Sequence, residues 1–285
     1  MSENCKGCPS QGTCSLQPGE CGVQKEKEDK SLLGALNRIN NIIVVMSGKG
    51  GVGKSSVTGL VAVALAQKGH RVGILDADIT GPSQPKAFGL KDIRLNASEY
   101  GIIPPSTRTN IKLMSINFFL PREDDPVIWR GPLLAGAVNQ FFKEVDWREL
   151  DYLVVDLPPG TGDVPLTVMQ SLPVNGIIIV SSPQELAFMV VKKTIKMTQK
   201  MKIPILGLVE NMSYAICPKC NEKLEIFGKS QGAKVAKETG IDFLGGLPWD
   251  VELNSLVDQG RIEDYVSQEM GSIVEKICNK LKKIN

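Results

Sequence analysis

Short runs of apolar, mostly β-branched residues alternate with longer segments of helical periodicity from Asn41 onward. The apolar runs predict strands at 42–46, 72–75, 152–155, 176–180, 205–209 and 243–247. The segments between and after them predict helices at 54–68, 133–142, 164–171, 185–200, 232–239 and 264–282. Buried strands that alternate with helices are typical of a mostly parallel sheet covered on both faces. We therefore expect a doubly wound α/β fold with ligands at the carboxyl ends of the strands.

Residues 1–30 differ from the rest of the chain. They contain no large apolar cluster, hold four of the seven cysteines and end in the charged run 25–30. Such a segment cannot bury enough apolar surface to fold alone. The whole chain has 285 residues and is 42% apolar, which suffices for one large core. We expect a flexible cysteine-rich extension and linker at 1–30 and a single domain at 31–285.

Charge and hydropathy exclude several classes of protein. The formal net charge is only +2, with acidic and basic residues interleaved, so no nucleic-acid footprint is expected. The chain has no run of eighteen apolar residues and begins with a polar segment, which predicts neither a transmembrane helix nor a secretory signal. We expect a cytoplasmic protein. Because the cytosol keeps thiols reduced, seven cysteines then favour metal or redox chemistry over structural disulfides.

A phosphate-binding loop follows the first predicted strand. Its residues fit the pattern G-x-x-x-x-G-K-[ST] and are Gly48, Lys49, Gly50, Gly51, Val52, Gly53, Lys54 and Ser55. Glycines let successive backbone N–H groups face one anion, and the helix that begins near Lys54 adds its positive end. Lys54 is expected to neutralise the β and γ phosphates and Ser55 to bind Mg²⁺, with Ser56 completing the nucleotide-binding set. The alternative is that these residues match the pattern by chance and form a flexible turn.

The second lysine of the loop, Lys49, indicates a particular class of phosphate-loop protein. The sequence K-G-G-V-G-K-S resembles the deviant phosphate loop of the MinD/ParA-like ATPases. The resemblance implies a P-loop NTPase fold in which Lys49 reaches across a dimer interface to the partner's nucleotide. A cation delivered in this way can stabilise charge on the transferring phosphoryl group and so couples hydrolysis to dimerisation. The alternative is a solvated lysine.

Carboxylates follow two of the predicted strands. Asp76 and Asp78 come directly after the second strand, and Asp156 follows the strand at 152–155. Mg²⁺ bound to phosphate and Ser55 needs carboxylates to hold its waters, and Asp156 and Asp76 are the candidates. Asp78 is the candidate for orienting the attacking water. All three could instead cap loops or helix N-termini.

Five segments carry a closer resemblance, to the Mrp/ApbC family of iron-sulfur cluster carrier ATPases. They are 76–83, 129–132, 156–163, 182–184 and 209–212, and the similarity spans about 36–280. The resemblance implies that Asn211 binds the adenine edge, that 158–163 is a switch sensitive to the γ-phosphate, and that the working unit is a homodimer. An asparagine amide offers a donor and an acceptor together, as adenine requires. Asn211 could also simply shape a turn.

Cys217 and Cys220 form a C-x-x-C pair after a predicted strand. Two thiolates cannot complete a four-coordinate site, but a symmetric dimer supplies two from each subunit, which suits a [4Fe-4S] cluster or zinc. The family resemblance favours the bridging cluster. A redox-active dithiol and a zinc knuckle are the alternatives.

Four further cysteines lie in the extension: Cys5, Cys8, Cys14 and Cys21. Four thiolates in a short chain can surround one soft metal site. Family members with such an extension carry a cluster on C-x₁₃-C-x₂-C-x₅-C, and this chain matches the last three positions but lacks the first. Cys21 is the candidate for the fourth ligand. Zinc, or a tail without a ligand, are the alternatives.

The last predicted helix has an apolar face and a basic end. Cys278 lies at helical spacing with Ile273, Val274, Ile277 and Leu281, which predicts a core position for it. The basic end at 280–283 could suggest a membrane-binding tail, but we expect a packed helix with a solvated end.

The resemblance and the residues together predict a homodimeric, MgATP-dependent carrier. It would hold a labile [4Fe-4S] cluster and pass it to apo iron-sulfur proteins, with slow, dimer-coupled ATP hydrolysis and with neither nucleic acid nor membrane as a partner. One alternative is a positioning ATPase of the MinD/ParA type, which leaves the cysteines unexplained. The other is an electron-transfer ATPase similar to nitrogenase iron protein, which would retain its cluster through redox cycles.

Overall fold

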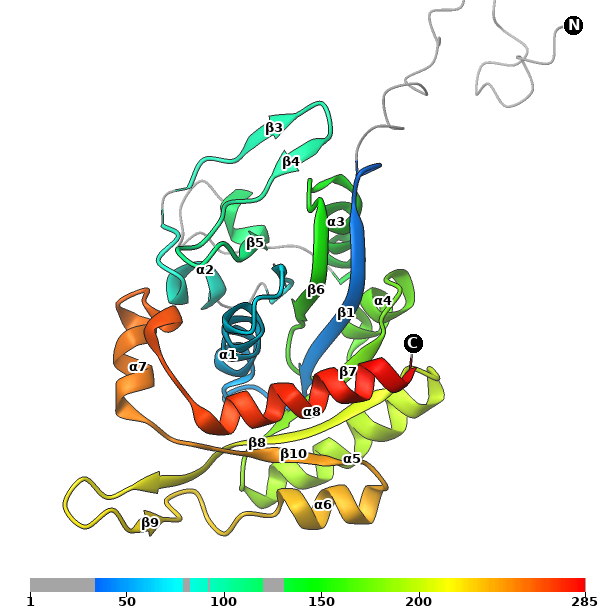
Figure 1. Cartoon of the computed structure of the whole chain (residues 1–285). Coiled ribbons are helices and arrows are strands. Elements are labelled where there is room, and N and C mark those ends of the chain that lie inside the picture. Colours follow the sequence, from blue (N-terminus) through cyan, green and yellow to red (C-terminus); the bar gives the residue numbers. More distant parts are fainter. Residues whose placement is uncertain (1–33, 79–82, 92, 120–130, 285) are drawn as a thin grey trace, which may run out of the picture.

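A computed structural model of the protein describes residues 34–78, 83–91, 93–119 and 131–284. Its main sheet has the strand order β10 (Phe243–Pro248), β8 (Ile205–Ile216), β7 (Gly176–Ser181), β1 (Arg38–Ser47), β6 (Glu149–Asp156), β2 (Val72–Asp76) and β5 (Lys112–Ser115), with β9 (Lys223–Leu224) paired to β8 (Figure 1). Neighbouring strands along this order are parallel, and β9 runs antiparallel to β8. The expected doubly wound, mostly parallel α/β fold is confirmed.

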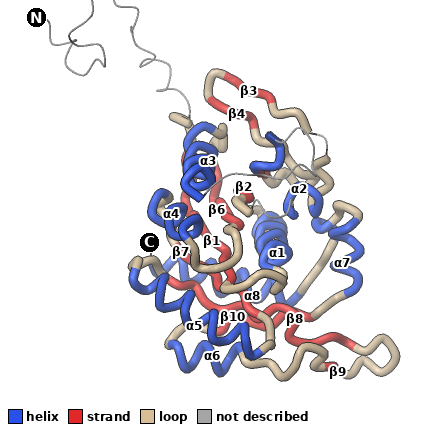
Figure 2. Tube along the Cα trace, turned by 180° about the vertical axis from the view of Figure 1, so that it is seen from behind, coloured by secondary structure: helices blue, strands red, loops and turns tan. Residues whose placement is uncertain are grey.

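Helices connect the strands and cover both faces of the sheet. They are α1 (Lys54–Gln67), α2 (Ser83–Ala87), α3 (Gly131–Glu144), α4 (Asp163–Ser171), α5 (Glu185–Lys200), α6 (Gly232–Thr239), α7 (Val251–Asp258) and α8 (Gln268–Ile284). Figure 1 shows α1 and α8 on one face, and Figure 2, seen from behind, shows α3, α4 and α5 on the other. Each of the six predicted helices corresponds to one of these.

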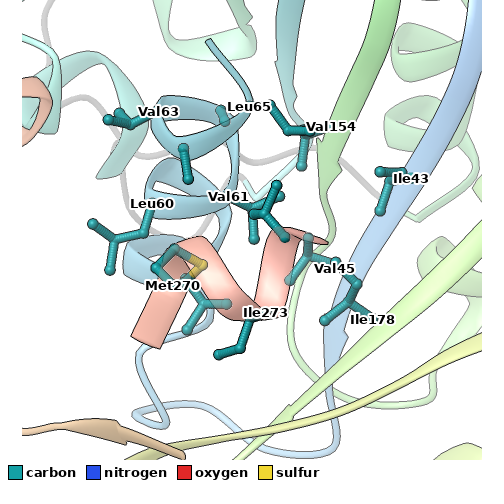
Figure 3. Packing of buried hydrophobic residues seen from close by; sticks show 14 of the residues in the cluster. Ile43, Val45, Leu60, Val61, Val63, Leu65, Val154, Ile178, Met270 and Ile273 are labelled. Carbon is teal, nitrogen blue, oxygen red and sulfur yellow. The ribbon is translucent and has the colours of Figure 1, made fainter. Parts of the chain in front are cut away.

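Strand β1 divides the apolar side chains between two cores. Ile43 and Val45 point to the face of α1 and α8, where they pack against side chains of both helices (Figure 3). Ile42, Val44 and Met46 point to the opposite face, covered by α3, α4 and α5. Successive side chains of a strand alternate between faces, so a strand buried on both sides must be apolar throughout. This explains why the predicted strands are continuous apolar runs.

The sequence pattern did not predict several short strands, and it gave other bounds for α8 and β8. Strand β5 is only four residues long and borders the sheet, and β3 (Asn96–Ser98) pairs with β4 (Gly101–Ile103) in a separate small sheet. Helix α8 begins at Gln268 instead of 264, because the 3₁₀ turn η4 (Ile262–Asp264) precedes it. Strand β8 continues to Ile216, well past its predicted end at 209. Its second half contains buried polar residues. The strand conformation there therefore depends on long-range contacts and not on a continuous apolar run.

Helix α8 packs along the sheet as expected. Its apolar residues Ile273, Val274 and Ile277 are buried. Its lysines also reach the sheet: Lys276 Nζ donates to the carbonyl of Leu244 at 2.6 Å, and Lys280 Nζ donates to that of Leu206 at 2.9 Å. Within the described residues, no helix is both long and apolar enough to cross a membrane.

Replacing Ile277 by alanine tests whether α8 belongs to the core. The side chain is fully buried, so Ile277→Ala is expected to lower the free energy of unfolding by about 2–5 kcal/mol. Glu275→Ala on the exposed side of the same helix is the matched control, and we expect it to change stability by no more than about 0.5 kcal/mol. Urea denaturation of both variants measures this difference. Equal stabilities would contradict the packing of α8.

Candidate functional site

The loop between β1 and α1 has the backbone of an anion-binding cradle. Gly51 and Gly53 adopt left-handed conformations, with φ of 78° and 74°, which residues with a Cβ rarely adopt. A Cβ at Gly51 would meet no atom within 4 Å, so the loop faces open space there. Helix α1 begins at Lys54 directly after this turn and directs its N-terminal N–H groups to the same side. The loop therefore has room and donors for phosphate.

The side chain of Lys54 is buried between two carboxylates. Its Nζ donates to Oδ1 of Asp156 and lies 3.1 Å from Oδ2 of Asp78, and the lysine is only 5% exposed. Burial alone would lower the pKa of Lys54, but the attraction of Asp156 and Asp78 outweighs it and the pKa is raised. The structure thus brings together three residues of the predicted nucleotide site: Lys54 for phosphate, Asp156 for Mg²⁺ and Asp78 for the attacking water.

Asp76 and Asp156 end neighbouring strands at the same level. They are partners in the parallel register of β2 and β6. The carboxylate of Asp76 accepts from the backbone N–H of Asp78 and from Ser115 Oγ, each at 3.1 Å. Complete burial, and next the proximity of Asp156, raise the pKa of Asp76 well above its ordinary value. This concentration of negative charge is suited to a bound cation.

Gln84 also belongs to this site, and the sequence analysis missed it. Its Nε2 donates to Oδ2 of Asp156 and to the carbonyl of Ser55, both at 2.9 Å, and the residue is 1% exposed. Oε1 of Gln84 and Oγ of Ser83 are buried without a hydrogen-bond partner among the described residues. Oxygen ligands and unpaired acceptors beside Ser55 fit a hydrated Mg²⁺. The available signal was position, since Gln84 directly follows the segment 76–83 that contains Asp76 and Asp78.

Lys49 points away from the buried cluster. Its Nζ donates to Oε1 of Gln184, the residue that precedes α5. The lysine is thus held within its own chain here, and its predicted action on a partner's nucleotide stays a prediction.

Asn211 lies against the loop from the side of β8. It is 7% exposed, and its Nδ2 donates to the carbonyl of Val52 at 3.0 Å. A Cβ added at Gly53 would collide with the same Nδ2 atom. The position places Asn211 beside the nucleotide loop, which is compatible with the predicted adenine contact but does not test it.

Cys217 and Cys220 lie in the turn of the β8–β9 hairpin. The N–H of Cys217 donates to the carbonyl of Glu222, and the N–H of Asn221 donates to that of Cys217, both at 2.9 Å. Cys217 is half-buried and Cys220 is exposed. Hydrogen bonds from the backbone N–H groups of Lys219 and Cys220 lower the pKa of the Cys217 thiol, which favours the thiolate that binds metals.

The remaining cysteines fall into two groups. Cys278 is half-buried against the core beside α1 and accepts a hydrogen bond from the Tyr152 hydroxyl at 3.4 Å, as a core position predicts. The four cysteines of the extension lie outside the described residues. Within the described part of the chain, no group of three or more His, Cys, Asp or Glu side chains could hold a metal ion. The Cys217–Cys220 pair therefore needs ligands from elsewhere to complete a site.

Two glycines of the loop provide a matched test of the contact with Asn211. Gly51→Ala places a Cβ in open space and should cost only the strain of the left-handed backbone, about 1–2 kcal/mol. Gly53→Ala adds the same strain and also forces Asn211 off the Val52 carbonyl, so a further loss of about 1–3 kcal/mol is expected. Thermal unfolding of the ligand-free proteins compares the two. Equal losses would show that Asn211 does not rest on the loop.

Comparisons with known proteins agree with this geometry. A family model described as "ParA: NUBPL iron-transfer P-loop NTPase" matches residues 38–282. The chain is 44% identical over 283 residues to the iron-sulfur cluster carrier protein of Methanocaldococcus jannaschii, covering 98% of this chain and 96% of the relative. It is 43% identical over 273 residues to that of Clostridium perfringens, covering 93% and 95%.

Solved structures with the same fold are also similar to this chain. The nucleotide-binding protein of Archaeoglobus fulgidus in complex with ADP is 46% identical, with a TM-score of 0.75 over 85% of this chain and 95% of that one. The cell division ATPase MinD of Pyrococcus furiosus, at 18% identity and a TM-score of 0.59 over 86% and 100%, shares the fold. The family expected from the sequence motifs is confirmed: this chain belongs to the NUBPL iron-transfer family of P-loop NTPases.

Proposed function

We propose that the protein is a homodimeric, MgATP-dependent carrier that binds a labile [4Fe-4S] cluster on Cys217 and Cys220 and transfers it to apo-proteins. The names of its relatives support a carrier of iron-sulfur clusters. Strand β8 carries the proposal, because it places Asn211 against the nucleotide loop and leads directly into the cysteine turn. The cytoplasm, where thiols stay reduced, is the compartment that suits this function.

The nucleotide half of the function uses residues already near one another. The backbone from Gly48 to Ser56 surrounds the phosphates, and Lys54 moves from its carboxylates to the phosphate oxygens. Mg²⁺, held by Ser55, Asp76 and Asp156, would neutralise charge on the phosphates. Gln84 orients Asp156, and Asp78 orients the attacking water.

Contact with a second subunit completes the nucleotide site. Lys49 leaves Gln184 and reaches the partner's nucleotide, and Asn211 binds adenine. Because one catalytic cation comes from the other subunit, hydrolysis is slow and coupled to dimerisation.

The cluster half of the function needs two chains. Each hairpin offers two thiolates, and a symmetric pair of hairpins offers the four that a [4Fe-4S] cluster takes. The accessible turn at Cys220 leaves room for an acceptor protein to approach. We propose that the four cysteines of the extension, Cys5, Cys8, Cys14 and Cys21, bind a second metal.

Iron and acid-labile sulfide, measured after anaerobic purification and reconstitution, test the cluster site. The wild type is expected to hold about two irons per monomer at Cys217 and Cys220, and this iron should be lost in the double variant Cys217→Ala/Cys220→Ala. Cys278→Ala is the control, since its thiol lies beside Tyr152, and should keep the iron. Iron that remains in the double variant would belong to the extension. Zinc in place of iron in the wild type would contradict the carrier function.

Lys54→Ala tests the dependence on nucleotide. The variant removes the cation that faces the phosphates, so ATP hydrolysis should fall by at least about a hundredfold. Cluster binding in the reconstituted protein should persist, because the hairpin does not contact Lys54. Transfer is measured as the activity gained by an apo-protein acceptor in cells that depend on this carrier. Undiminished transfer by Lys54→Ala would show that nucleotide and delivery are not coupled.

A further inference from the structure

Strand β8 is irregular at the point where it passes the nucleotide loop. Its register with β10 changes from Glu210 opposite Gly246 to Tyr214 opposite Pro248, so β8 advances four residues while β10 advances two. The extra residues form a bulge at 211–213. A bulge bends a strand and redirects the side chains beyond it.

Met212 at the centre of the bulge has a left-handed backbone, with φ of 58°. A side chain longer than that of glycine, asparagine or aspartate is uncommon in this region, and its backbone is strained. Such conformations persist only where the surroundings hold them. Here the surroundings include the nucleotide loop, because Met212 Cε would lie 3.5 Å from a Cβ built on Gly53.

The residues on either side of the bulge differ in how firmly they are held. On the first side, the buried carboxylate of Glu210 accepts from the N–H groups of Gln231 and Gly232 at 2.9 and 2.7 Å. Ser213 Oγ, at the end of the bulge, donates to Oε2 of Glu210 at 2.7 Å. The bonds from Gln231 and Gly232 anchor β8 to the start of α6.

The strand is still held at Tyr214, whose carbonyl accepts from the N–H of Trp249 at 2.6 Å and whose hydroxyl donates to Glu269 at 3.1 Å. Beyond the buried Ala215 the packing is lighter. Ile216 and Leu224 of the hairpin are 45% and 41% exposed. Lys223 Nζ lies 4.3 Å from the centre of the Tyr214 ring, a contact at the surface. A change in the bulge is therefore transmitted toward the hairpin, because the buried part of β8 is the harder part to move.

We infer that Met212 is a positioning residue that links occupancy of the nucleotide loop to the exposure of Cys217 and Cys220. This inference rests on the proposed function, for which it supplies the connection between the two sites. When nucleotide binds, Asn211 exchanges the Val52 carbonyl for the ligand and the position of the Met212 side chain beside Gly53 changes. The strained backbone then takes its extended alternative, which rotates the residues leading to Cys217. The solvent exposure of Cys217 and Cys220 thus differs between the nucleotide-free and the nucleotide-bound state of the loop.

Alkylation of the full-length protein without cluster tests this link. The rates at Cys217 and Cys220 are measured by peptide mass spectrometry, with and without saturating MgADP or the MgATP analogue AMP-PNP. In the wild type, nucleotide should change these rates by at least about fivefold, the lower end of measured couplings between sites. Cys278, beside Tyr152, serves as the internal control and should not change.

Met212→Gly removes both the strain and the side chain that lies beside Gly53. Nucleotide affinity should stay within about threefold of wild type, whereas the effect of nucleotide on the two cysteines should vanish. Met212→Leu keeps an apolar side chain against the loop and should retain the effect. Lys202→Gly is the matched backbone control, because Lys202 has the same φ of 58° in the exposed turn that precedes β8, outside the bulge.

Three results would overturn the inference: no nucleotide effect in the wild type, an unchanged effect in Met212→Gly, or loss of nucleotide binding in that variant. The last would make Met212 a binding residue. Because the measurement needs no iron, it fails independently of the carrier function. If nucleotide changes the alkylation of Cys217 and Cys220 but the protein binds no cluster, the inferred link between the two sites stands. The proposed cargo, an iron-sulfur cluster, is then rejected.

Discussion

The burial of Lys54 among carboxylates is the constraint on which the nucleotide site depends. One cation faces Asp156 and Asp78, and Asp76 lies beside them in the register of the sheet. A nucleotide phosphate that entered alone would bring more negative charge to a site that already has an excess of it. The same phosphate accompanied by a divalent cation gives Lys54 a new partner and leaves the carboxylates compensated. The arrangement thus favours the proposed metal-bound nucleotide over a nucleotide without a cation.

Strand β8 connects the nucleotide site to the turn that contains Cys217 and Cys220. Its first half is an ordinary buried strand, and its second half carries Glu210, Asn211 and Ser213, which are polar and buried. Buried polar groups are tolerated only when they are hydrogen-bonded, and each of these is bonded to a different part of the chain: the start of α6, the nucleotide loop and the strand itself. The strand is therefore held by specific contacts where it passes the loop, and the inferred link between nucleotide and cysteines acts through them.

Local sequence patterns were sufficient for the framework but not for these contacts. The strands buried on both faces are unbroken apolar runs, and the loop motif fixes where β1 ends and α1 begins, so Lys54, Asp76 and Asp156 could be placed at one edge of the sheet. Gln84 and the second half of β8 could not be placed, because their conformation depends on partners far away in sequence: Asp156 for Gln84, and Gln231 and Gly232 for Glu210. Strand β5 was missed for a related reason, since four residues at a sheet border carry too little periodicity.

The placement of the cysteine pair follows from what a carrier must do. A cluster bound by four thiolates of one buried chain segment would be retained, since release would require that segment to unfold. Two thiolates in a hairpin turn, one half-buried and one exposed, provide only half of a ligand set and remain within reach of an acceptor. In the proposed dimer, their affinity for a cluster would depend on the distance and orientation of the two hairpins. Because β8 begins in the core, contacts the nucleotide loop through Asn211 and leads into the cysteine turn, it provides a covalent connection through which ATP would set that orientation in the proposed carrier.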